Sequence, residues 1–159
     1  MIRIATAADQ DYIYNIYMHP QVNPFILYEP MSKEEFDPIY KDLIEKKVKF
    51  IYTDNDVATG MFKLIPLTHR TSHIVYLGAL AIHPDLKGRG HGKKMMYEII
   101  EFVRSRGFLR IELSVADINT IAINLYEETG FRKEGILKNY SFLEKEQRFM
   151  DEILMAYLY

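Results

Sequence analysis

The 159-residue chain contains no cysteine and no long hydrophobic run. The first absence excludes disulfides, thiol catalysis and thiolate metal sites, and it permits a reducing compartment. The second excludes a helical membrane span, which needs about 20 apolar residues. The first residues include Arg3 and Thr6 and lack the pattern of a signal peptide. We therefore expect a cytoplasmic protein with no membrane partner.

An excess of either charge is also missing. Lys and Arg number 20 against 22 Asp and Glu, which gives a net charge of −2. A dedicated nucleic-acid partner is therefore not expected. His69 and His73 stand four residues apart, but no third candidate ligand accompanies them. No metal site is expected either.

Repeats, linkers and low-complexity tracts are absent, and 48% of the residues are hydrophobic. This composition predicts one globular domain, residues 1–159, with a mixed α/β (α+β) architecture around a central sheet. Helices are expected at 6–18, 32–44, 90–106 and 119–130. Strands are expected at 2–4, 48–53, 57–65, 74–82, 109–115, 131–138, 140–143 and 148–158.

Local patterns place several element ends. Thr6 with Asp9, and Ser32 with Glu35, are typical of helix N-termini. Pro38 conflicts with a straight start of the second helix, so an alternative start lies at Asp37. The strand–helix–strand order of 74–115 predicts two parallel strands joined by a right-handed crossover.

The loop Lys87-Gly88-Arg89-Gly90-His91-Gly92 lies between the strand at 74–82 and the helix that follows. A strand, a glycine-rich loop and a helix start together favour an anion site, because bare loop amides and the helix dipole can face phosphate oxygens. The spacing of the glycines matches neither a Walker A loop nor a dinucleotide-binding fingerprint.

The same six residues resemble the Gln/Arg-x-x-Gly-x-Gly/Ala loop of the GNAT superfamily of N-acetyltransferases, with lysine in the first position. Further along, Asn119-Thr-Ile-Ala-Ile-Asn-Leu-Tyr126-Glu-Glu-Thr-Gly130-Phe131 is similar to the second signature of that family, Asn-x-x-Ala-x-x-Leu-Tyr-x-x-x-Gly-Phe. The resemblance covers about Ile74 to Phe131. It implies a mixed central sheet flanked by helices, with a splayed parallel strand pair that holds the cofactor.

The cofactor implied by the resemblance is acetyl-coenzyme A, with its pyrophosphate on the loop amides and its pantetheine arm beside the preceding strand. Lys93 and the neighbouring Lys94 could equally be solvated charges at a helix start. Asn119 caps its helix and, in the family, also touches the cofactor. The implied cofactor-binding residues are Leu80, Ala81, Ile82, Lys87, Gly88, Arg89, Gly90, His91, Gly92, Lys93 and Asn119.

The resemblance implies that Tyr126 is the acid that protonates the departing thiolate. The alternative is a core tyrosine on the apolar face of its helix. The general base is open. Some family members carry a carboxylate five residues before the asparagine, where this chain has Ser114. Glu112, Tyr28 and Glu29 are other candidates, as are a water held by Ser114 and an amine that arrives neutral.

These features predict an acetyl-coenzyme A dependent N-acetyltransferase that acts on a primary amine of a small molecule or of a protein. The alternatives are an acyl-coenzyme A sensor without turnover and a toxin that acts on charged tRNA, which the net charge disfavours. Family members often form homodimers. Pocket walls are expected from residues 20–30, 66–73 and 136–148, although the aromatic loop at 20–30 could instead cover the core.

Overall fold

The computed structural model describes all residues, 1–159. Its backbone groups into two compact units: Met1–Leu64 with Ala79–Met95, and Ile65–Gly78 with Met96–Tyr159. The strand β4 (Ile74–Ile82) and the helix α3 (His91–Arg104) run from one unit into the other. No helix is long and apolar enough to cross a membrane.

The first unit is built on three antiparallel strands and two helices. β1 pairs with β2, and β2 pairs with β3. Asn55 and Asp56, at the tip of the β2–β3 hairpin, both have left-handed backbones, with φ of 49° and 62°. Such a turn suits the right-handed twist of the two strands, and the predicted hairpin is confirmed. The elements are β1 (Ile2–Ile4), α1 (Gln10–Tyr17), α2 (Lys33–Glu45), β2 (Lys49–Asp54) and β3 (Val57–Pro66).

The core of this unit is formed by the apolar faces of α1 and α2 packed against strand residues. Tyr17 contacts the ring of Phe36 at 5.5 Å between centroids, and Phe36 contacts Tyr40 at 6.0 Å. The buried cluster comprises Ala5, Ile13, Ile16, Tyr17, Val22, Phe36, Tyr40, Ile51, Met61 and Ala81. Part of the loop at 20–30 covers this core, since Ile26 and Tyr28 pack on the cluster.

The start of α2 departs from one expectation. Ser32 and Glu35 form the predicted capping box, and the helix continues through Pro38 to Glu45. The alternative start at Asp37 is therefore wrong. Proline removes one backbone hydrogen bond inside the helix, but the capping box and the burial of Phe36 and Tyr40 hold the first turn in place.

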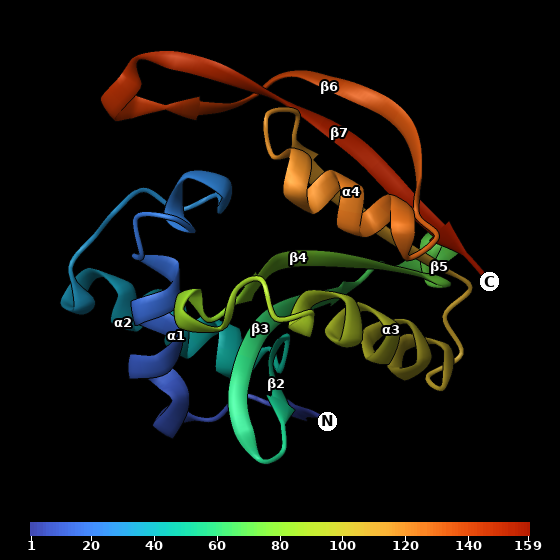
Figure 1. Ribbon diagram of the computed structural model, residues 1–159, viewed down its shortest axis with the longest axis horizontal. Coiled ribbons are helices and arrows are strands. Elements are labelled where there is room, and N and C mark those ends of the chain that lie inside the picture. Colours follow the sequence, from blue (N-terminus) through green and yellow to red (C-terminus); the bar gives the residue numbers. More distant parts are fainter. The chain divides into compact units, whose positions relative to one another are not determined.

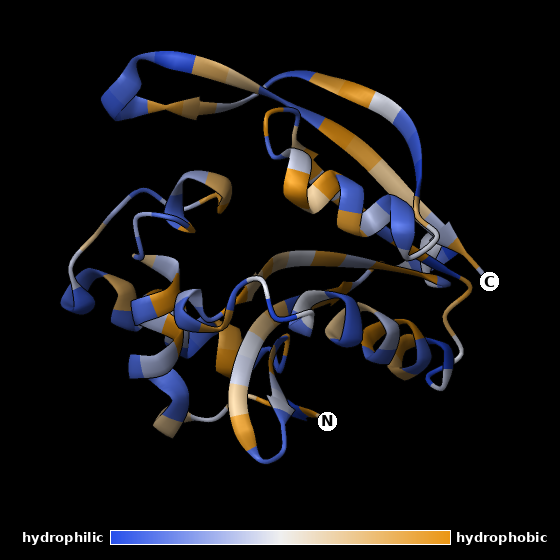
Figure 2. Ribbon diagram, in the orientation of Figure 1, coloured by the Kyte–Doolittle hydropathy of each residue, from blue (hydrophilic) through white to orange (hydrophobic).

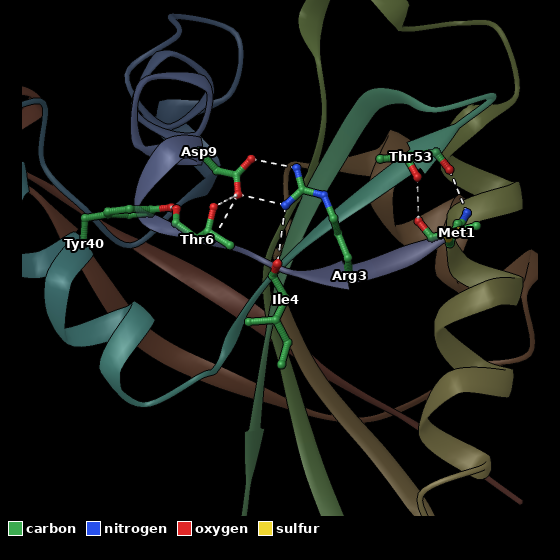
Figure 3. Close-up of polar contacts among 7 residues, drawn as sticks. All are labelled: Met1, Arg3, Ile4, Thr6, Asp9, Tyr40 and Thr53. Carbon is green, nitrogen blue, oxygen red and sulfur yellow. Dashed lines mark hydrogen bonds and ion pairs between the residues drawn. The ribbon is translucent and has the colours of Figure 1, made fainter.

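A polar network fixes the N-terminal segment (Figure 3). Asp9 accepts hydrogen bonds from the guanidinium of Arg3 at 2.8 and 2.7 Å and from the backbone amide of Thr6 at 2.8 Å. These donors hold the pKa of Asp9 at about 2. The Tyr40 hydroxyl donates to the carbonyl of Thr6 at 2.6 Å, which ties α2 to the same turn. Thr6 precedes a short 3-10 turn, Ala7–Asp9, and the α-helix itself begins later than expected, at Gln10.

The second unit contains a parallel and two antiparallel strand pairs. β4 pairs in parallel with β5, β5 pairs antiparallel with β7, and β7 pairs antiparallel with β6. In Figure 1 β6 and β7 form a long hairpin, coloured orange to red. The elements are β5 (Arg110–Ala116), α4 (Thr120–Glu128), β6 (Arg132–Leu143) and β7 (Arg148–Leu158).

The helix α3 is amphipathic, as its sequence predicts. Figure 2 shows hydrophobic and hydrophilic bands alternating along it. Its inward positions are all buried: Met95, Met96, Ile99, Ile100 and Val103. Gly107, with φ of 81°, follows the helix and gives the left-handed turn at which the chain leaves it. The strands hydrogen-bond in the order β1-β2-β3-β4-β5-β7-β6. The expected mixed α/β fold is confirmed.

Candidate functional site

The glycine loop has the backbone that its sequence predicts. A short 3-10 turn, Pro84–Leu86, ends β4, and α3 begins at His91. Between them Gly88 and Gly90 have φ of 75° and 80°, a region that side chains rarely adopt. No atom lies within 4 Å of a Cβ built on either glycine. The loop therefore presents exposed backbone and open space in front of the first turn of a 14-residue helix.

Charge around this loop favours an anion, because Lys87, Arg89, Lys93 and Lys94 are all exposed. One acid moderates this charge. Asp54, at the end of β2, lies 3.1 Å from Nδ1 of His91 and 3.4 Å from Nζ of Lys94. These contacts tie the start of α3 to the β2–β3 hairpin, so His91 has a structural partner as well as a place beside the loop.

The end of β4 directs one row of backbone groups away from β3. The amide of His83 donates to the carbonyl of Thr59 in β3 at 2.8 Å. Backbone groups alternate along a strand, so those of Ala81 also face β3, and those of Leu80 and Ile82 face away from it. Ala79 has φ of 47°, a strained value for alanine, and marks an irregularity inside the strand.

The ladder between β4 and β5 covers Ile74 to Tyr76, and Ala79 follows it in the sequence. The splayed strand pair implied by the resemblance stays a prediction.

Tyr126 lies on α4, in the second unit. Asn119 caps this helix, with its Oδ1 accepting from the amide of Ala122 at 3.2 Å, and Gly130 ends it with φ of 102°. The ring of Tyr126 packs on that of Phe131, 5.9 Å between centroids, and 7% of the residue is exposed. Burial raises the pKa of the Tyr126 phenol. The residue therefore holds its proton at neutral pH, as a general acid must before it acts.

Three further polar side chains gather on the strands of this unit. The hydroxyl groups of Tyr76 in β4 and Ser114 in β5 are 2.9 Å apart. Ser114 is also a hydrogen-bond partner of the Glu152 carboxyl in β7, and 4% of Glu152 is exposed. Burial raises the pKa of Glu152, and the bond from Ser114 works against this rise. Tyr76 is close enough to Tyr126 to raise the pKa of that phenol.

Sequence reasoning missed Glu152, because no local motif surrounds it. One signal was present. Met150, Glu152 and Leu154 are alternate residues of one strand, so a carboxylate occupies an otherwise apolar row. A charged residue in such a row requires a polar partner, but the partner comes from β5, which the sequence around Glu152 does not identify.

The other residues considered as bases have different surroundings. The carboxylate of Glu112 accepts from Nε of Arg110 at 2.8 Å. Tyr28 packs edge-on against Tyr17, 5.3 Å between ring centroids, and Glu29 is exposed in the loop of the first unit. No group of three or more His, Asp or Glu side chains is placed to hold a metal.

A family model and curated relatives both match this chain as an N-acetyltransferase sequence. The family model described as the acetyltransferase (GNAT) family matches residues 10–131. The [ribosomal protein bS18]-alanine N-acetyltransferase of Haemophilus ducreyi is 34% identical over 79 residues, which cover 50% of this chain and 54% of that protein. The chain thus spans about half the length of the relatives it matches.

Two solved structures resemble almost the whole chain. The spermidine N-acetyltransferase from Vibrio cholerae, in complex with CoA and spermine, superposes with a TM-score of 0.86 at 23% identity, covering 99% of this chain and 94% of that one. The ribosomal-protein-alanine N-acetyltransferase from Brucella melitensis gives a TM-score of 0.80 at 20% identity, covering 100% and 99%. At these identities the likeness establishes the fold.

Proposed function

Because the chain belongs to the GNAT acetyltransferase family, we propose that it transfers the acetyl group of acetyl-coenzyme A to a primary amine. The observation that carries the proposal is the glycine loop: Gly88 and Gly90 in left-handed conformations, with open space beside them, at the start of a long helix. Both glycines lie within the residues that the family model matches.

The residues of the loop fit the cofactor. Exposed amides and basic side chains between Lys87 and Lys93 would hold its pyrophosphate. The backbones of Leu80 and Ile82, which face away from β3, would bind the amides of its pantetheine arm. When bound, acetyl-coenzyme A supplies an activated acetyl thioester.

We assign the acid to Tyr126. Expulsion of a thiolate is easier when a proton is delivered to the sulfur, and a phenol that keeps its proton at neutral pH can supply it. An ordinary tyrosine phenol already keeps its proton at neutral pH, and burial raises the pKa of Tyr126 further, so the phenol is protonated before the thiolate forms.

The acceptor that fits best is a small polyamine or the N-terminus of a protein. One group of relatives is named for alanine of ribosomal protein bS18, and a structural neighbour was solved with spermine. Exposed apolar residues on the β6–β7 hairpin, such as Phe142 and Phe149, are consistent with a homodimer.

We treat both units as one acetyltransferase domain, because the matched residues 10–131 include parts of each.

The direct test is an assay of thiol release. The protein is mixed with acetyl-coenzyme A and with spermidine, a peptide that begins with alanine, or a peptide with an internal lysine. Release of free thiol with at least one amine is expected. Tyr126→Phe should lower kcat by about 100-fold and leave the Kd of coenzyme A unchanged. Tight cofactor binding without thiol release for any amine would overturn the proposal in favour of an acyl-coenzyme A sensor.

A further inference from the structure

We propose that Glu152 accepts the proton of the incoming amine, through a relay formed by Tyr76 and Ser114. The inference rests on the proposed acetyl transfer and gives it the base that the sequence did not identify. Each member comes from a different strand of the second unit: Tyr76 from β4, Ser114 from β5 and Glu152 from β7.

The strand register explains why these side chains meet. β5 lies between β4 and β7, and Ala116 of β5 is directly opposite Glu152. Ser114, two residues before Ala116, projects from the same face of the sheet and is a diagonal neighbour of Glu152. Its hydroxyl bonds the carboxyl of Glu152 and lies 2.9 Å from the hydroxyl of Tyr76. The three side chains therefore form one continuous series of hydrogen bonds.

The carboxylate of Glu152 decides which group donates in each of these hydrogen bonds. An ionised carboxylate can only accept hydrogen bonds, so the Ser114 hydroxyl donates to Glu152. The oxygen of Ser114 is then the acceptor for the phenol of Tyr76. A proton that reaches Tyr76 can move to Ser114 and then to Glu152 by small shifts along existing hydrogen bonds.

Glu152 differs from the other acids around it because its hydrogen-bond partner is the hydroxyl of Ser114 and not a cation. Asp151, the next residue, pairs with Lys138 at 2.6 Å, and Glu112 pairs with Arg110 at 2.8 Å. Besides Glu112 and Arg110 on β5, the titratable groups around the relay are the phenols of Tyr76, of Tyr126 on α4 and of Tyr140 on β6. A buried carboxylate without a cation is a stronger base than an exposed one, because its charged form is less well solvated.

The step balances as follows. The ammonium form of the amine loses one proton, which passes through Tyr76 and Ser114 to the Glu152 carboxylate. The neutral nitrogen attacks the acetyl carbon, a carbon–nitrogen bond forms, and the carbon–sulfur bond breaks. Tyr126 gives its proton to the leaving sulfur and regains one from the acetylated nitrogen. Glu152 finally releases its proton to solvent, so that the net products are the amide, the free thiol and one proton.

The experiment compares Glu152→Gln with the wild type over a range of pH, using spermidine or the alanine peptide, whichever the wild type acetylates. Glutamine has the shape of glutamate but cannot take up the proton. We expect kcat to fall by about 100-fold or more, within the usual range for a lost general base. The KM for acetyl-coenzyme A should stay unchanged. Only amine that is already neutral can react in this variant, so kcat/KM should keep rising with pH toward the pKa of the amine, whereas in the wild type it should level off above the pKa of Glu152.

Two further variants separate proton transfer from folding. Glu152→Asp keeps a carboxylate and should recover part of the activity together with a pH profile that levels off as in the wild type. Asp151→Asn changes an adjacent acid that projects from the other face of β7, and it should stay within about twofold of the wild type.

Several outcomes overturn the inference. A Glu152→Gln enzyme with the kcat and pH profile of the wild type would do so, as would one in which only the KM for the amine rises, since that result identifies a binding group. If the wild type itself releases no thiol with any amine, the proposed function fails, and the inference fails with it. If only the relay is wrong, the wild type still acetylates an amine, so this outcome is distinguishable from failure of the proposed function.

Discussion

Lys49 is the residue whose surroundings least suit its chemistry. It is fully buried at the start of β2, and its Nζ lies 3.1 Å from the Tyr17 hydroxyl and 4.6 Å from the centroid of that ring. Its cross-strand neighbour on β3 is another basic residue, Lys63. Burial, and to a lesser extent the charge of Lys63, lower the pKa of Lys49 far below its ordinary value.

This shift makes stability depend on pH in a definite direction. The unfolded chain binds a proton at Lys49 more tightly than the folded chain does, so stability rises with pH from the lowered pKa up to the ordinary value of about 10.4. Lys49→Met removes the group and should flatten this slope, while raising the free energy of unfolding at pH 7 by about 1–3 kcal/mol. Urea unfolding at pH 7 and pH 9 measures both effects.

The control for this prediction is Lys41→Met, which replaces an exposed lysine of α2 by the same residue. It should leave the pH slope as in the wild type. An unaltered slope in Lys49→Met would show that Lys49 keeps an ordinary pKa in the folded protein.

At the scale of elements, the sequence predicts best those features that neighbouring residues decide. The caps at Ser32 and Asn119 and the stop at Gly107 are confirmed, because each depends on contacts within a few residues. Helix α2 continues past Pro38 because tertiary burial of its apolar face outweighs one lost hydrogen bond. The helix preferences of neighbouring residues do not show how much apolar surface the folded protein will bury.

The polar side chains of the candidate site show what a single sequence does not predict. Tyr126 and the glycine loop are recognisable because each belongs to a contiguous motif. The Tyr76–Ser114–Glu152 chain is not, because its members are far apart in sequence and meet only through the pairing of β4, β5 and β7. A single sequence predicts that such strands exist, but the register that makes Ser114 a neighbour of Glu152 depends on the whole sheet.

The glycine loop allows a test with a closely matched control. Gly90→Ala places a methyl group in the open space before α3 and forces alanine into φ of 80°. We expect a cost of about 1 kcal/mol in stability and a loss of at least about tenfold in the affinity for coenzyme A, measured by isothermal titration calorimetry.

Gly107→Ala is the control, because Gly107 has φ of 81° and equally open surroundings, but follows the end of α3. It should cause a similar loss of stability with no change in affinity. Equal affinity losses in the two variants would point to general destabilisation, and a normal affinity in Gly90→Ala would remove the loop from the cofactor site.

At the scale of the whole molecule, the proposed tasks fall to different parts of the chain. The glycine loop and the end of β4 belong to the first unit, whereas Tyr126, Tyr76, Ser114 and Glu152 belong to the second. Cofactor binding and proton transfer should therefore be separable by mutation. A change in the polar side chains of the second unit leaves the loop amides intact, and a change in the loop leaves the proton relay intact.

Thermal unfolding with coenzyme A tests this separation on the intact protein. A ligand that binds only the folded state stabilises it by about 2.7 kcal/mol at 100 times its Kd, which for a chain of this size raises Tm by roughly 5–10 °C. The wild type and Tyr126→Phe should show the same rise, and Gly90→Ala should show little at the same concentration. One cooperative transition that shifts as a whole would support a single domain. A wild-type Tm that stays constant up to millimolar coenzyme A would contradict the cofactor assignment, and a rise lost in Tyr126→Phe would show that binding also depends on the second unit.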